Sequence, residues 1–144
     1  MTSMTEQRQA GHAADEQISA AGRAACEGVL AQWMAALNRH DATAMDELMR
    51  FPHVRVASER VVVYDAPGNN PMDLFRRLRE QDGWHHSEWN ETKLVQSSPV
   101  KAHYAVRYTR FREDNSIIGV YDSLYVLTSV DGEWRVQCRS SFGP

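Results

Sequence analysis

The 144-residue sequence has little of several features that would identify a function directly. It has only two cysteines, Cys26 and Cys138, and they show neither metal-ligand spacing nor a disulfide framework. No apolar run approaches the ~18 residues of a membrane helix, and the N-terminus lacks the order of a secretory signal. With 16 Lys and Arg against 19 Asp and Glu, the chain has no basic excess to attract nucleic acid. These absences predict a reduced, cytoplasmic protein without a nucleic-acid or membrane partner.

The composition that remains is that of one ordinary globular domain. Hydrophobic residues make up 42% of the chain and charged residues 24%, close to the usual values. Residues 1–20 are rich in Gln, Ala, Ser and Thr and have no sustained apolar period, so burial cannot offset the entropy of ordering them. We therefore expect a flexible tail over 1–20 and a single domain over 21–144.

Three helices are predicted in the N-terminal half. From Gly22 to Asn38, apolar residues recur every three or four positions, as in an amphipathic helix. Asp41 is a suitable N-cap for a short second helix that Pro52 would end. A third helix is predicted from residues 70–71, an Asn-Pro pair that supplies a cap and a first-turn proline, to Gly83.

The rest of the pattern is β-structure. Two β-branched runs, 53–57 and 60–64, predict a small hairpin. Turn-forming residues then separate four long strands, which predicts an antiparallel meander over residues 85–96, 101–112, 117–129 and 133–142.

Two stretches carry a resemblance to a known family. They are Val29-Leu-Ala-Gln-Trp-Met-Ala-Ala-Leu-Asn38 with Asp41 following, and the closing Val130-Asp-Gly-Glu-Trp-Arg-Val136. With the order of elements, they make the chain similar to the nuclear transport factor 2-like superfamily, in particular its SnoaL-like bacterial branch, over about residues 22–142. The resemblance implies an α+β cone with three helices packed on a strongly curved antiparallel sheet. It also implies a pocket at the open end and a homodimer joined through the outer sheet face.

The resemblance does not carry an activity with it. Steroid isomerisation, the best understood chemistry of the superfamily, uses a tyrosine, a general base and a second acid. The corresponding positions here hold Trp33, Ala57 and Asp122, and only the last is an acid. The His-x-His ending of many SnoaL-like sequences is also absent, because Cys138 and Ser140 stand at those places.

Strand alternation still predicts one acid–base site. If Tyr108 and Asp122 share the pocket face, pairing through the turn at 97–99 brings His86 and Glu88 onto it. One imidazole and two carboxylates around an apolar cavity are sufficient for cofactor-free proton transfer or hydrolysis. The predicted catalytic residues are therefore His86, Glu88 and Asp122.

Two alternatives to this site remain open. A shift of one residue in the strand pairing would bring a different set to the cavity, namely His85, Ser87 and Trp89. In the second alternative, His86 and Glu88 lie at a strand end in solvent, and Asp122 forms a structural pair with Arg110.

The candidate ligand-binding residues are aromatic, cationic or polar: Trp33, His53, Arg55, Tyr64, Asn90, Tyr108, Arg110, Cys138 and Ser140. His53 and Arg55 are in phase on the first short strand and would suit an anionic ligand group. The alternative is that both are exposed, with Val54 and Val56 turned to the core. No metal is expected, since adjacent residues such as His85 and His86 point to opposite faces of a strand.

The sequence leaves two functional hypotheses. The first is a homodimeric protein that binds a small, partly apolar molecule in the pocket, without a cofactor, and possesses acid–base turnover of the isomerase, cyclase or hydrolase type. The second is a non-catalytic interaction protein that presents its outer sheet face to a partner through Trp89, Ala105, Phe111, Tyr125 and Leu127. An enclosed cavity with convergent polar groups distinguishes the first from the second.

Overall fold

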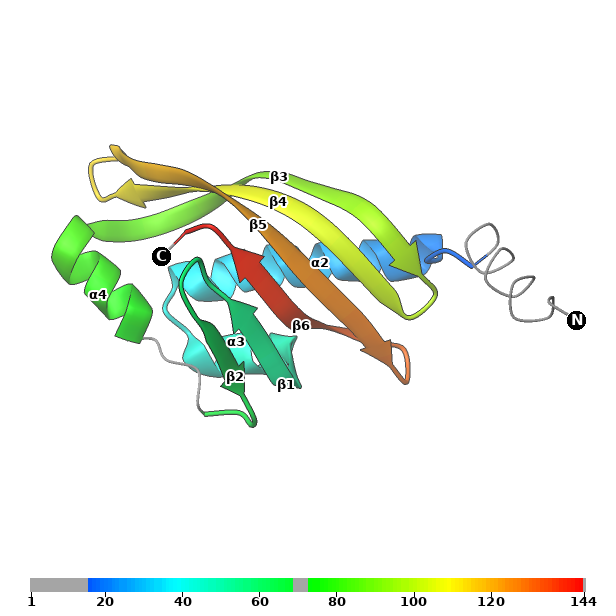
Figure 1. Cartoon of the computed structure of the whole chain (residues 1–144). Helices are drawn as coiled ribbons and strands as arrows, with labels where there is room; N and C mark the ends of the chain where they lie inside the picture. The colour runs from blue at the N-terminus through cyan, green and yellow to red at the C-terminus, as the bar shows by residue number, and fades with distance from the viewer. Residues whose placement is uncertain (1–15, 69–72, 144) are drawn as a thin grey trace, which may run out of the picture.

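The structure, a computed structural model, describes residues 16–68 and 73–143 (Figure 1). Within them the helices are α2 (Ala20–Asn38), α3 (Ala42–Leu48) and α4 (Asp73–Asp82). The strands are β1 (Met49–Val56), β2 (Val61–Tyr64), β3 (Trp84–Ser98), β4 (Lys101–Arg112), β5 (Ile117–Val130) and β6 (Glu133–Ser141). The predicted α+β class and the four-strand meander are thus confirmed, with strand ends within two residues of those expected.

The six strands form one curved sheet in the order β2-β1-β6-β5-β4-β3. Neighbours are antiparallel except β1 and β6, which run parallel. Helix α2 lies along the concave face of the long strands, and α4 lies at the end where β3 begins (Figure 1). The space between α2, α4 and this inner face is therefore the interior of the cone.

The helix signals act as predicted, with small shifts in position. Ser19 caps α2, because its Oγ accepts a hydrogen bond from the Gly22 amide at 3.0 Å. Asp41 caps α3 in the same way through the Ala44 amide. The helix begins at Ala20, and Ile18 packs against the core, so the predicted tail is wrong for residues 18–20. Residues 1–15 of that tail lie outside the described residues.

The prediction that Pro52 ends the second helix is wrong, because α3 already ends at Leu48. Met49 is the first residue of β1 and is not helical, and Pro52 lies inside that strand. The proline fits because the pairing of β1 with β6 is interrupted between Met49 and Val54, where a missing amide costs no ladder hydrogen bond. The expected hairpin follows, with His53 opposite Tyr64. The predicted start of the third helix at residues 70–71 lies outside the described residues.

The core lies between α2 and the inner sheet face. Leu30 and Trp33 of α2 are buried against Tyr104, Leu127 and Val136 from three different strands. No described helix is long and apolar enough to cross a membrane. Hydrophobic burial of this inner face is the main force that holds α2 to the sheet.

A reciprocal pair of hydrogen bonds fixes the C-terminal end of α2 to the edge of the sheet. Asn38 Nδ2 donates to the Ser87 carbonyl at 2.8 Å, and the Ser87 amide donates to Asn38 Oδ1 at 2.8 Å. Since β3 is the terminal strand, this side chain supplies Ser87 with the partner that a seventh strand would provide.

We expect Asn38→Ala to lower the free energy of unfolding by about 1–3 kcal/mol, because both main-chain groups of Ser87 lose their partner. Urea denaturation followed by tryptophan fluorescence measures this change. Gln32→Ala, at an exposed position on the same helix, is the control and is expected to change stability little. Equal stabilities for the two variants would contradict the prediction.

Candidate functional site

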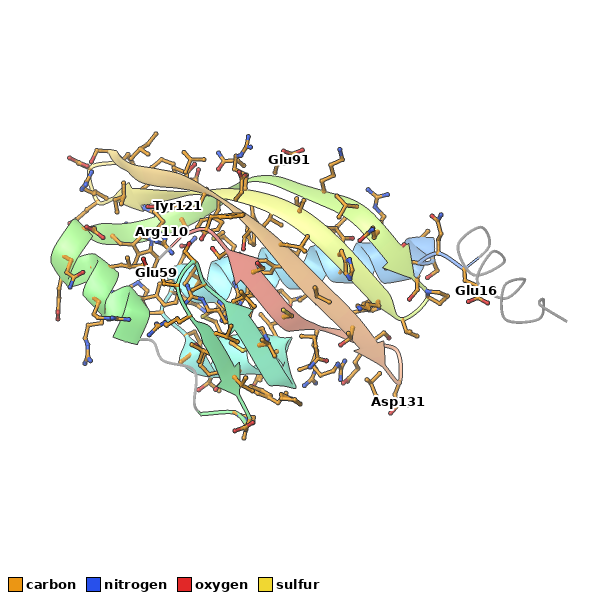
Figure 2. The ribbon with its side chains drawn as sticks, in the orientation of Figure 1. Glu16, Glu59, Glu91, Arg110, Tyr121 and Asp131 are labelled. Carbon is orange, nitrogen blue, oxygen red and sulfur yellow. The ribbon has the colours of Figure 1, made fainter. Side chains whose placement is uncertain are left out.

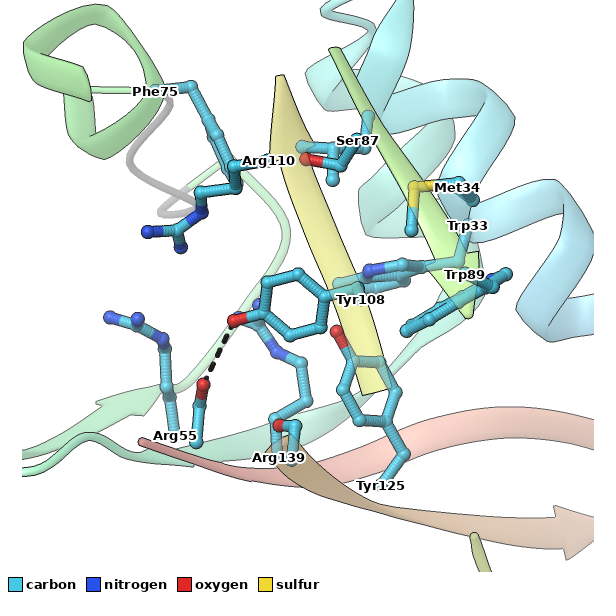
Figure 3. A pocket seen from close by; sticks show the side chains of 13 residues that line it. Trp33, Met34, Arg55, Phe75, Ser87, Trp89, Tyr108, Arg110, Tyr125 and Arg139 are labelled. Carbon is cyan, nitrogen blue, oxygen red and sulfur yellow. Dashed lines mark hydrogen bonds between the residues drawn. The ribbon is translucent and has the colours of Figure 1, made fainter. Parts of the chain in front are cut away.

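A cavity of about 40 Å³ lies in the interior of the cone (Figure 3). It is lined by residues of α2, α4 and five strands: Trp33, Met34, Leu37, Arg55, Phe75, Ser87, Trp89, Tyr108, Arg110, Ser123, Tyr125, Arg139 and Ser141. The described lining therefore combines an aromatic and aliphatic wall with three arginines and three serines.

Aromatic rings form the wall beside α2. Trp33 and Trp89 both meet Tyr125 edge to face, with ring centroids 5.9 and 5.5 Å apart. Trp89 also donates from its indole Nε1 to the Leu30 carbonyl of α2 at 2.9 Å. These contacts tie the wall to the helix and leave the ring faces to define its shape.

Three arginines also line the cavity, although arginine is rarely buried. Arg55 is 5% exposed, Arg110 4% and Arg139 9%. In Figure 3 their side chains come from β1, β4 and β6 and lie around the Tyr108 hydroxyl, away from Met34. The site thus has a cationic side and an apolar side.

Aromatic faces support two of these guanidinium groups. The guanidinium carbon of Arg110 lies 4.8 Å from the Tyr121 ring centroid, and both residues are labelled in Figure 2. That of Arg139 lies 4.9 Å from the Trp33 ring. Attraction of a cation to a ring face stabilises the arginine without neutralising its charge.

His53 holds Arg139 from behind the cavity. Its Nδ1 is 2.9 Å from the Val136 carbonyl, so Nδ1 carries the proton and donates, while Nε2 accepts from Arg139 Nε at 2.9 Å. Burial, with the positive charge of Arg139 as the next cause, lowers the pKa of His53 to about 3. The imidazole is therefore neutral at pH 7 and adds no charge to the site.

Contacts from Ser141 and Gly143 set the position of the Tyr108 phenol in the cavity lining. Tyr108 Oη and Ser141 Oγ share a hydrogen bond of 3.1 Å (Figure 3). A Cβ on Gly143 would come within 2.8 Å of Tyr108 Oη, closer than real Cβ contacts allow. The absence of a side chain at Gly143 therefore lets the phenol keep its place.

Four of the predicted ligand-binding residues line the cavity: Trp33, Arg55, Tyr108 and Arg110. Two others, His53 and Tyr64, lie in the layer behind it, with ring centroids 6.0 Å apart. The hypothesis that His53 and Arg55 are exposed is wrong, since both are buried. Val56, which that hypothesis turned to the core, is instead 37% exposed.

The predicted catalytic trio does not reach the cavity. Asp122 pairs with Arg107 across the sheet, and Tyr108 pairs with Tyr121, which places Asp122 on the face opposite Tyr108. Asp122 therefore binds Arg107 Nε at 2.9 Å on the exposed outer face and is not paired with Arg110. The assumption that Tyr108 and Asp122 share a face is wrong.

The other members of the predicted site also face outward. His86, opposite Phe111, and Glu88, opposite Thr109, lie on the outer face. Asn90 accepts a hydrogen bond from Thr109 at 2.8 Å on that same face. The alternative pairing, which named Ser87 and Trp89, matches the structure for those two residues.

A β-bulge displaces the predicted residues of β6. Val136 pairs with Leu127, and the next pair is Cys138 with Val126, so Gln137 is the extra residue. The alternation of β6 therefore reverses after Val136: Arg139 and Ser141 line the cavity, and Cys138 and Ser140 turn to the outer face. The predicted roles of Cys138 and Ser140 at the ligand lose their geometric basis.

Several lining residues were not among the predicted ligand contacts: Met34, Leu37, Phe75, Ser123, Tyr125, Arg139 and Ser141. The helix stripe that predicted the core already contained Met34 and Leu37. Tyr125 and Leu127, assigned to a partner surface in the interaction hypothesis, are buried in the interior instead. Among residues 16–68 and 73–143, no three His, Cys, Asp or Glu side chains come together as a metal site.

The chain belongs to a family of nuclear transport factor 2-like proteins. The family model described as "NTF2-like protein (DUF6841)" matches residues 23–139, most of the chain. A search of curated proteins finds no match. The resemblance to the superfamily is thereby confirmed.

Solved structures show the same fold at low sequence identity. A cystatin-like-fold protein of unknown function from Nostoc punctiforme is 12% identical, with a TM-score of 0.72 over 88% of this chain and 93% of that one. An NTF2-like protein from Novosphingobium aromaticivorans is 15% identical, with a TM-score of 0.69 over 99% of this chain and 90% of that one. A putative ketosteroid isomerase from Shewanella frigidimarina is 14% identical, with a TM-score of 0.65 over 81% of this chain and 94% of that one. These likenesses establish the fold alone.

His53 makes stability depend on pH. Above about pH 6.5 the imidazole is neutral in both the folded and the unfolded chain, so its full contribution is present. As the pH falls from 6.5 toward 3, the unfolded chain binds a proton that the folded protein does not. The free energy of unfolding then decreases by at most about 1.4 kcal/mol per pH unit.

We expect His53→Gln to reduce this slope, because glutamine can donate and accept hydrogen bonds at the same place but does not titrate. Urea unfolding between pH 4 and 8 measures the slope. Gln32→Ala, which removes no titratable group, is the control and is expected to keep the slope of the parent protein. A slope unchanged by His53→Gln would contradict the prediction.

Proposed function

We propose that the protein binds a small, partly apolar molecule in the cavity between α2, α4 and the inner sheet face. The observation that carries this proposal is the two-sided lining, with aromatic rings on one side and buried arginines on the other. A core built for stability alone would fill such a space with apolar side chains, because buried charges are costly. Convergent polar groups in an enclosed apolar cavity are typical of ligand sites.

The geometry supports binding better than acid–base turnover. The described lining contains no Asp, Glu or His, the residues that most often act as general acids and bases. Burial raises the pKa of Tyr125, so its hydroxyl stays protonated and acts as a hydrogen-bond donor. Turnover by the predicted trio would require a substrate on the outer face, where Asp122 is already paired with Arg107.

The size of the cavity limits what it can hold. About 40 Å³ of such space accommodates roughly three water molecules, whereas sites for drug-sized ligands are roughly 300–1,000 Å³. A ketosteroid, the substrate for which one structural neighbour is named, is far larger than this. The proposal therefore concerns a smaller molecule, or a small part of a longer one.

Blocking the cavity tests the proposal. Ser141→Phe places a ring in the cavity and is expected to abolish binding of small apolar compounds. Binding is detected through the fluorescence of Trp33 and Trp89 in the cavity wall. Ser116→Phe, at an exposed turn, is the control and is expected to bind as the parent does.

The compounds for this test are fragments of no more than about ten non-hydrogen atoms, screened by fluorescence and confirmed by ligand-observed NMR. Compounds that bind the parent and Ser141→Phe equally would place the site elsewhere. A parent protein that binds no fragment would contradict the proposed function.

For the expected homodimer, we propose the central part of the outer sheet face as the contact. Half-buried apolar residues are adjacent there: Ala105 pairs with Leu124, and Cys138 pairs with both Val126 and Val54. A second copy of the same patch would cover these side chains and remove them from water.

Leu124→Arg is expected to shift the protein from dimer to monomer, because it places an unpaired charge in the centre of this contact. Size-exclusion chromatography with light scattering measures the mass. Val95→Arg, on the terminal strand β3, is the control and is expected to leave the mass unchanged. A parent protein with the mass of one chain would contradict the proposed dimer.

A further inference from the structure

We propose, resting on the function proposed above, that the bound molecule is a small carboxylate whose anionic group lies between Arg55 and Arg139. The apolar part of the acid would pack against the aromatic wall of Trp33 and Trp89.

Arg55 is the first observation. Its side chain is buried at 5% exposure, and none of the ion pairs among the described residues includes it. A guanidinium removed from water without a counter-charge is unfavourable, so a protein that retains one in a cavity is built for an anion. Burial and the adjacent charge of Arg139 lower the pKa of Arg55, but a guanidinium stays protonated near pH 7.

Arg139 is the second, independent observation. Buried arginines are usually fixed by Asp or Glu, but Arg139 is fixed by the neutral His53 and by the face of Trp33. Both contacts hold the guanidinium in position and leave its positive charge uncompensated. Nε donates to His53, and Arg139 also has a side-chain hydrogen bond with Tyr125. The remaining N–H groups of the guanidinium can donate to a planar two-oxygen group such as a carboxylate.

The surroundings leave the charge of Arg55 and Arg139 in place. The described lining of the cavity includes no Asp or Glu. Serine hydroxyls of the lining, such as Ser141 and Ser87, can donate hydrogen bonds to an oxyanion.

An adjacent groove differs in charge. Arg55 also lines this groove of about 530 Å³, which lies between the β1–β2 hairpin, α4 and Phe142. Its lining includes Glu59 and Asp82 as well as Arg55, Arg60 and Arg77, so acidic groups offset two of its three arginines. The described lining of the inner cavity has no acidic group, which distinguishes it from the groove.

Size and polarity together favour a carboxylate over inorganic phosphate. Room for roughly three waters fits the carboxylate of a small acid. Inorganic phosphate would leave the wall formed by Met34, Trp33 and Leu37 without an apolar partner. A small organic acid satisfies both sides of the cavity.

Matched pairs of acid and amide test the proposal on the parent protein. Propionate and propionamide, and benzoate and benzamide, have nearly the same shape and differ in charge. Isothermal titration calorimetry and thermal unfolding are measured in a low-salt buffer free of other carboxylates, phosphate and sulfate. We expect at least one acid to bind and to raise Tm, with its amide at least tenfold weaker.

Variants locate the anion. Arg55→Gln is expected to raise Kd for the acid about tenfold or more. Without ligand its Tm is expected to be at least that of the parent, because an uncompensated buried charge has been removed. Arg107→Gln, which removes an exposed arginine of the outer face, is expected to leave Kd unchanged. Unchanged affinity in Arg55→Gln would overturn the assignment of Arg55.

The outcomes separate this proposal from the one on which it rests. If an amide binds as tightly as its acid, the carboxylate class is wrong and the proposed binding function stands. If phosphate or sulfate binds and no carboxylate does, the class is also wrong. If neither acids, amides nor neutral fragments bind, the proposed function fails as well. The acid–amide comparison uses the parent protein, so it decides the proposal even if Arg55→Gln does not fold.

Discussion

The cavity depends on one constraint of β-structure, the strict alternation of side chains, and on two of the places where the sheet breaks it. The bulge at Gln137 reverses the alternation of β6 and turns Arg139 inward. The side-chain Nε2 of Gln137 donates a hydrogen bond to the Pro52 carbonyl of β1. This contact lies in the segment where β1 and β6 lose their regular pairing. A second bulge, at Asn90, lets β3 direct Trp89 inward and place Thr92 opposite Val106 of the inner face. Both walls of the cavity follow from these irregularities.

Most of the fold could be predicted from the sequence because its signals are local. Asp41, Gly83 and the turn residues between the long strands mark boundaries through their own backbone preferences. The site could not be predicted equally well, because a bulge is a single extra residue in a strand. The residues on either side of it could face the interior or the solvent, so the sequence does not mark its position. Cys138 and Arg139 are adjacent, and hydrophobicity alone assigns the thiol to the interior and the guanidinium to solvent. The structure has the opposite arrangement.

The buried arginines also explain why the predicted strand faces were wrong at the site and right in the core. In the core, hydrophobic burial and strand alternation assign the same face to Tyr104, Leu127 and Val136, so sequence and structure agree there. At Arg55 and Arg139 the two rules conflict, and such conflicts are expected where a protein sacrifices stability for a ligand. The neutral His53 is part of the same arrangement, since an acid in its place would cancel the charge of Arg139.

The hydrogen bonds between Asn38 and Ser87 have a consequence for solubility. A terminal strand with unpaired amides and carbonyls is a template onto which another chain can add, and β3 is the longest strand of the described sheet. Asn38 occupies one such pair of groups next to the cavity residue Trp89. Fraying of the last turn of α2 would therefore expose unpaired main-chain groups of β3. By occupying them, Asn38 protects the folded chain from strand-to-strand aggregation.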